Sequence, residues 1–128
     1  MVEVDKTLYP IIIFRSLPVE VSDQDLEEYL MGLEKILREA PEKLVIIHDI
    51  NKSRFLSGDQ LSRIRKWSLD SKALFDEKTL ATGVVSSSVL SSLIIKAIRF
   101  LLKSNFTSEI FSNMDTALSW AKKRLNEK

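Results

Sequence analysis

The stretch VIIHDINKSRFLSG, residues 45–58, decides the fold. An unbroken apolar run leads into His48 and Asp49, a polar loop follows, and Ser57 then opens a helical pattern. An apolar run without alternation is typical of a strand that is buried on both faces of a parallel sheet. The stretch therefore predicts a central strand over residues 43–50, a loop over 51–56 and a helix that begins at Ser57.

The alternation of strands and helices extends to both ends of the chain. It implies parallel pairing through right-handed crossovers, and the opening hairpin adds one antiparallel edge strand. We expect an α/β fold in the order ββαβαβαβα, with a mixed, mainly parallel sheet of four to five strands, four helices and a single domain over residues 1–128. The predicted strands cover residues 2–6, 8–15, 43–50, 79–85 and 107–111, and the predicted helices begin near residues 22, 57, 86 and 112.

Capping residues mark the starts of the first two helices. Ser22 has Asp25 three positions later and Ser57 has Gln60, which is the spacing of a capping box. Pro41 ends the first helix. The predicted inner faces are Leu26, Tyr29, Leu30, Leu33, Ile36, Leu37 and Ala40 in the first helix, and Leu61, Ile64, Trp67, Ser68, Ser71, Leu74 and Phe75 in one continuous second helix.

Composition excludes several classes of protein. Apolar residues are 45% and charged residues 29% of the chain, which is ordinary for a globular domain, and the net charge of +1 gives no general field that would attract nucleic acid. The absence of cysteine excludes disulfides and thiol chemistry and suits a reducing compartment. The N-terminus does not resemble a signal peptide, and no apolar segment is long enough to span a bilayer, so we expect a cytoplasmic location.

The chain carries no known catalytic or cofactor motif. No nucleophile elbow, phosphate-binding glycine loop or paired-histidine zinc motif occurs. His48 is the one histidine, and strand alternation places it and Asp49 on opposite faces, so the two are not expected to form an acid–base pair. We therefore expect no catalytic residue, no metal site and no cofactor, and we assign His48 a structural role.

The polar corner after the central strand is the first candidate site. It contains Asp49, Asn51, Ser53 and Ser57. Ligands and partners of open parallel sheets meet the carboxyl ends of strands, and a phosphate on Ser53 or Ser57 would lie near free N–H groups at a helix start. In the alternative interpretation, Asp49 and Asn51 only bond loop amides. The serines at 86–92 leave the same choice open, between an anion site and an ordinary helix cap.

The predicted third helix, residues 89–103, is more apolar than one sheet contact requires. Its polar stripe is about 60° wide, whereas a helix that covers a sheet needs an apolar arc of roughly 100°. The surplus surface must meet a neighbouring helix, a protein partner or second copy, or a lipid or other apolar ligand. The candidate contact residues are Leu93, Ile94, Ile98, Phe100 and Leu102, with Met31 and Leu69 as apolar residues that point away from their helices' inner faces.

The order and lengths of these segments resemble the small STAS-like (SpoIIAA-like) domains, a group that includes bacterial anti-sigma-factor antagonists. The resemblance rests on EVD before YPIIIF, on VIIHDIN ending in Asp49, and on the tail EIFSNMDTALSWAKKRL. It implies a non-catalytic binding module whose helices pack largely on one side of the sheet. Some STAS-like proteins are similar in outline to the CRAL-TRIO lipid-binding domains, which implies an apolar-ligand carrier as an alternative.

The sequence departs from the antagonists at the residue that they phosphorylate. Their central strand is followed by Asp-x-Ser-Gly or Asp-x-Ser-Ser, whereas here Asp49 fits the aspartate and Asn51 stands in the place of the serine. Ser53 and Ser57 are the substitutes that a phosphoserine switch would need. We expect instead a protein-interaction or regulatory module that self-associates, with a homodimer as the simplest closed assembly.

Overall fold

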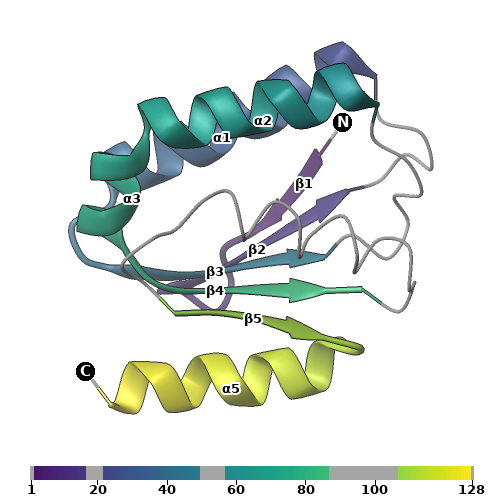
Figure 1. Cartoon of the computed structure of the whole chain (residues 1–128). Coiled ribbons are helices and arrows are strands. Elements are labelled where there is room, and N and C mark those ends of the chain that lie inside the picture. The colour runs from purple at the N-terminus through teal and green to yellow at the C-terminus, as the bar shows by residue number, and fades with distance from the viewer. Residues whose placement is uncertain (1, 17–21, 50–56, 87–106, 128) are drawn as a thin grey trace.

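The computed structural model describes residues 2–16, 22–49, 57–86 and 107–127 (Figure 1). A five-stranded sheet in the order β1-β2-β3-β4-β5 runs through the middle of the molecule, with β1 antiparallel to β2 and all other neighbours parallel. This confirms the predicted mixed sheet and its antiparallel edge. The elements are β1 (Val2–Asp5), β2 (Ile11–Ser16), α1 (Asp23–Glu39), β3 (Leu44–Asp49), α2 (Gly58–Asp70), α3 (Lys72–Lys78), β4 (Thr79–Val85), β5 (Thr107–Phe111) and α5 (Met114–Asn126).

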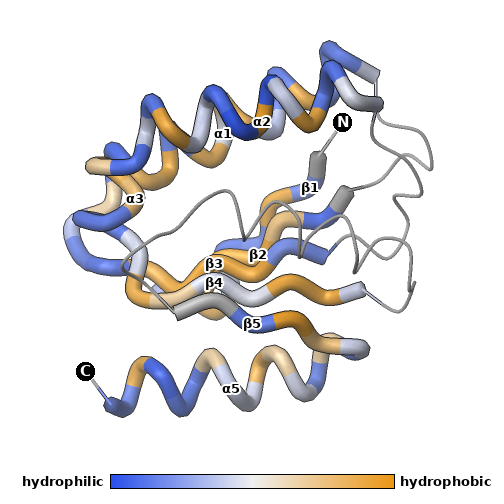
Figure 2. The backbone as a smooth tube through the Cα atoms, in the orientation of Figure 1, coloured by the Kyte–Doolittle hydropathy of each residue, from blue (hydrophilic) through white to orange (hydrophobic). Residues whose placement is uncertain are grey.

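The two faces of the sheet carry separate apolar cores. Strands β2 and β3 are apolar along most of their length, as Figure 2 shows, and alternate side chains enter the two cores. The core beneath α1 and α2 consists of Ile12, Phe14, Leu26, Leu30, Leu33, Leu37, Ala40, Leu44, Ile46 and Trp67. The core beneath α5 consists of Ile11, Ile13, Val45, Ile47, Ala81, Val85, Ala117 and Ala121.

The described helices cover both faces of the sheet. Helices α1, α2 and α3 form a layer on one face, and α5 packs on the opposite face against β3, β4 and β5 (Figure 1). Three of the four described helices therefore lie on one side of the sheet, as expected, and α5 covers the other side. The reason is that β3 and β4 are apolar on both faces, so each face needs a cover.

Both predicted capping boxes are present. The Ser22 hydroxyl accepts a hydrogen bond from the Asp25 N–H at 3.0 Å, and the Asp25 carboxylate accepts one from the Ser22 N–H at 3.1 Å. Ser57 and Gln60 form the same reciprocal pair at the start of α2. These bonds satisfy N–H groups that have no partner within the first turn of a helix.

The predicted second helix is interrupted at Ser71. Its φ of −102° and ψ of 9° depart from helical values, so α2 ends there and α3 begins. Eight residues of straight helix would separate Trp67 from Phe75 by about 12 Å along the axis. The interruption brings the two rings edge to face with centroids 5.1 Å apart. The apolar spacing continues through Ser71, and neither glycine nor proline marks the break in the sequence.

The turn between β1 and β2 is longer than predicted. Strand β1 ends at Asp5 and β2 begins at Ile11, because residues 7–10 form turns closed by the bonds Tyr9 N–H to Lys6 C=O and Ile11 N–H to Leu8 C=O. Pro10 therefore precedes the strand instead of lying within it.

Candidate functional site

The carboxyl ends of the parallel strands meet the starts of α1 and α2 at one edge of the sheet (Figure 1). Asp49 is the last residue of β3. The two helix starts are joined by a hydrogen bond from the Gln60 side-chain amide to the Asp23 carboxylate at 3.2 Å, and Gln60 is 6% exposed. The described part of this edge therefore offers Asp49 and two capped helix starts.

A hydrogen-bonded pair of aromatic side chains lies at this edge beneath α1. The Tyr29 hydroxyl, from α1, bonds the His48 Nδ1, from β3. Their rings stack with centroids 5.7 Å apart, and Phe14 of β2 stacks on His48 at 5.8 Å and meets Tyr29 at 5.4 Å. Phe14 is 1% exposed, so this aromatic cluster continues the core beneath α1 to the end of β3.

Burial sets the protonation states of this pair. It lowers the pKa of His48 from 6.5 to about 4, because an imidazolium loses hydration among apolar side chains. Burial also raises the pKa of Tyr29, and the negative charge of Asp49 adds to that rise. Near neutral pH the imidazole is therefore uncharged and the phenol keeps its proton, which suits a hydrogen bond from the Tyr29 hydroxyl to Nδ1.

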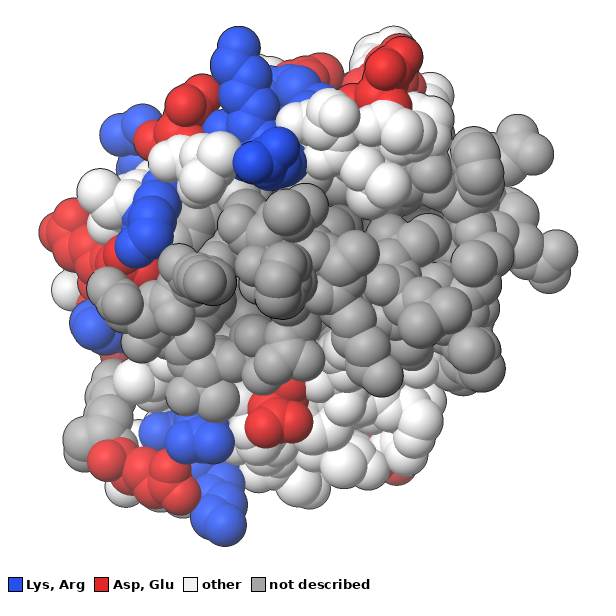
Figure 3. All heavy atoms as spheres, viewed as in Figure 1, with Lys and Arg blue, Asp and Glu red and all other residues white. Residues whose placement is uncertain are grey.

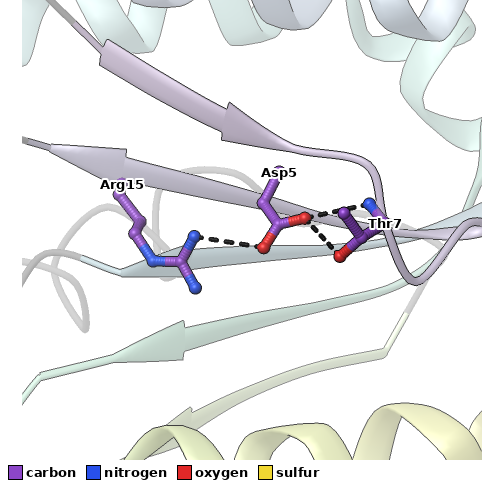
Figure 4. Close-up of polar contacts among 3 residues, drawn as sticks. All are labelled: Asp5, Thr7 and Arg15. Carbon is purple, nitrogen blue, oxygen red and sulfur yellow. Dashed lines mark hydrogen bonds and ion pairs between the residues drawn. The ribbon is translucent and has the colours of Figure 1, made fainter.

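A second polar cluster lies where β1 and β2 pair (Figure 4). The Asp5 carboxylate accepts hydrogen bonds from the Thr7 hydroxyl at 2.6 Å and the Thr7 N–H at 2.9 Å. Arg15 approaches the other carboxylate oxygen at 3.3 Å. Thr7 and then Arg15 lower the pKa of Asp5. Arg15 is also the register partner of Asp49, so the Arg15 end of this cluster lies beside the carboxyl end of β3.

The structure places two of the four residues of the predicted phosphate corner. Asp49 ends β3, and Ser57 precedes α2 with its hydroxyl bound to the Gln60 N–H at 3.0 Å. Asn51 and Ser53 lie outside the described residues, as do Ser87, Ser88, Ser91 and Ser92. Ser57 therefore serves as the predicted helix cap, whereas the predicted phosphate corner stays a prediction.

The predicted apolar contact face lies mostly outside the described residues. This applies to Leu93, Ile94, Ile98, Phe100 and Leu102. Met31 and Leu69 are described, and they are 65% and 52% exposed. Both therefore have the outward orientation that the helical spacing predicts.

Acidic and basic residues are interspersed on the face that Figure 3 shows. Within residues 2–16, 22–49, 57–86 and 107–127, no group of three or more histidine, cysteine or acidic side chains could hold a metal ion. Over those same ranges, every helix is too short or too polar to cross a membrane.

The Tyr29–His48 contact was not predicted from the sequence, although a signal for it exists. Tyr29 lies on the apolar face of a helix, and His48 follows an apolar run in a strand. Aromatic side chains with polar tips that lie partly within a core usually have a hydrogen-bond partner. The sequence therefore allows Tyr29 and His48 to be predicted as hydrogen-bond partners.

The chain has a SpoIIAA-like, or STAS-like, α/β fold. The chain is similar to an uncharacterised protein of the DUF3478 family with a SpoIIAA-like fold from Shewanella loihica PV-4, with a TM-score of 0.68 and 15% sequence identity over 94% of this chain and 92% of that chain. No family model matches the sequence. Curated proteins give no match either. The structural similarity confirms the resemblance of fold that the sequence patterns indicate.

Proposed function

We propose that this chain is a non-catalytic regulatory module that acts by binding a protein, and that in its simplest assembly this protein is a second copy of the chain. The observation that carries the non-catalytic part is the Tyr29–His48 pair. The chain has one histidine and no cysteine, and the hydrogen bond to Tyr29 occupies Nδ1 of that histidine. An imidazole with a pKa of about 4 is a weak general base near neutral pH.

Exposed apolar side chains on the helical layer support the association part. Met31 on α1 and Leu69 on α2 are the most exposed large apolar residues among those that the structure describes. Single exposed apolar residues are common on monomers, so these two gain weight only together with the surplus apolar surface predicted for residues 89–103. We assign the contact surface to that predicted helix, with Met31 and Leu69 as additional candidate contact residues.

Sedimentation velocity over a range of concentrations tests this proposal. The wild-type chain is expected to sediment as a dimer, and Ile98→Glu is expected to give a folded monomer, because a charge in an apolar interface opposes association. Ser119→Glu is the matched control, since Ser119 is exposed on α5 and the same charge there leaves the proposed surface intact. Circular dichroism of each variant establishes whether it is folded.

Three results would contradict the proposal. The first is a wild-type chain that stays monomeric at every concentration. The second is an unfolded Ile98→Glu variant, which would place Ile98 in the interior of the subunit. The third is a lipid that co-purifies with a monomer in native mass spectrometry, which would favour the apolar-ligand carrier instead.

A further inference from the structure

The aromatic cluster of Phe14, Tyr29 and His48 connects α1 with the carboxyl end of β3. Tyr29 lies in the second turn of α1, and His48 is the penultimate residue of β3. Their hydrogen bond is therefore a polar connection between α1 and the end of the strand that carries Asp49. Apolar side chains of α1 also pack against Ile12, Phe14, Leu44 and Ile46 in the core beneath it.

The surroundings of His48 disfavour a charge. The register partners of His48 are Phe14 on β2 and Val84 on β4, and both are uncharged. Among the described groups, the titratable ones at the cluster are the Tyr29 hydroxyl and the carboxylate of Asp49, whose charge acts on Tyr29. The nearby acidic residue Glu27 on α1 is bound to Arg63 of α2 by two hydrogen bonds, so its charge is already compensated.

We propose that the Tyr29–His48 pair is an acid-sensitive latch that fastens the first half of α1 to the carboxyl end of β3. Protonation of His48 removes Nδ1 as a hydrogen-bond acceptor and places a positive charge in a half-buried cluster where it loses hydration. The closed latch then becomes less favourable than an arrangement in which the imidazolium reaches water. The latch concerns only the attachment of α1 to β3, so it does not depend on the identity of a binding partner.

The direction of the pH dependence follows from linkage. The closed state binds a proton at His48 near pH 4, whereas an open state with a hydrated imidazole binds it near pH 6.5. Between these values the open state holds more protons, so acidification favours opening. Lowering the pH from 7 to 4.5 is expected to increase the open population by about 60-fold.

Hydrogen exchange of backbone amides, corrected for intrinsic exchange rates at each pH, measures this opening. In the wild-type chain, the protection of residues 23–31 is expected to fall by about 60-fold between pH 7 and pH 4.5. The protection of β3 and β4 is expected to fall much less, because their backbone bonds are to neighbouring strands and not to α1. In His48→Asn, which keeps an acceptor near the position of Nδ1 and cannot be protonated in this range, the selective loss is expected to disappear.

A second variant keeps the latch testable if His48→Asn does not fold. Tyr29→Phe keeps the ring and removes the hydroxyl, so it is expected to lower the protection of residues 23–31 about 10-fold at pH 7. Equal loss of protection in β4 would show that protonation unfolds the whole chain, and the latch would be wrong. An undiminished selective loss in His48→Asn, or unchanged protection in Tyr29→Phe, would also overturn it.

Discussion

At the scale of single residues, several side chains are constrained by contact with one particular neighbour. The sequence alone predicts that Ser22 and Ser57 cap helices, because a capping box is a local pattern of four residues. It does not predict the neighbours of Tyr29 or Gly83, because those contacts join elements that lie far apart in the chain. Local sequence patterns therefore predict where helices begin, whereas contacts between distant residues are known only from the structure.

Gly83 of β4 is one such position. A Cβ atom there would lie 3.1 Å from Cζ3 of Trp120 and 3.4 Å from Cε2 of Phe111, so the ring of Trp120 occupies the space that any larger residue needs. We predict that Gly83→Ala lowers the free energy of unfolding by about 1–3 kcal/mol, as overpacked core substitutions do. Urea unfolding measures the change.

Gly32 in α1 is the matched control for this prediction. A Cβ atom there meets nothing within 4 Å, so Gly32→Ala is expected to raise the free energy of unfolding by about 0.5–1 kcal/mol through helix propensity. A Gly83→Ala variant as stable as the wild-type chain would show that Trp120 does not pack closely on β4.

At the scale of elements, buried aromatic packing holds the helical layer more firmly than its ion pairs do. Trp67 of α2 is 8% exposed, belongs to the core beneath α1 and meets Phe75 of α3 edge to face. The pair formed by Arg63 of α2 and Glu27 of α1 has side chains that are 39% and 43% exposed. Exposed ion pairs are screened by water and add little to stability.

This contrast gives a prediction about the attachment of α2. Trp67→Ala is expected to lower the free energy of unfolding by about 3–5 kcal/mol, because it leaves a cavity beneath α2 and α3. Arg63→Ala is expected to leave it nearly unchanged. Thermal and urea unfolding of both variants measure the difference. If the Arg63 variant proves as destabilised as the Trp67 variant, the ion pair holds α2 more firmly than its exposure indicates.

Element boundaries show where sequence patterns stop being informative. The strands β4 and β5 begin and end where the apolar runs predict. The break at Ser71 has no signal in the sequence, because the chain has neither glycine nor proline there and its apolar spacing continues. The late start of β2 follows from Pro10 and the bonds within the preceding turn, a combination that the apolar pattern does not reveal.

At the scale of the whole molecule, the parallel pairing of the strands follows from their alternation with predicted helices. The order of the strands in the sheet, β1-β2-β3-β4-β5, comes from the structure. The face that each helix covers does not follow from that order, and the position of α5 opposite the other described helices was not predicted. For the candidate site, the sequence places Asp49 and Ser57, while the pairing of Tyr29 with His48 emerges only from the fold.

The commitment of the one histidine to Tyr29 carries the proposed non-catalytic role, and a proton NMR titration of the imidazole tests it most directly. The chain contains a single histidine, so its ring signals need no further assignment. We predict a pKa of about 4 and no change in those signals between pH 7.5 and pH 5.5. An imidazole that titrates near 6.5 would show that His48 is open to water and free to act as a base.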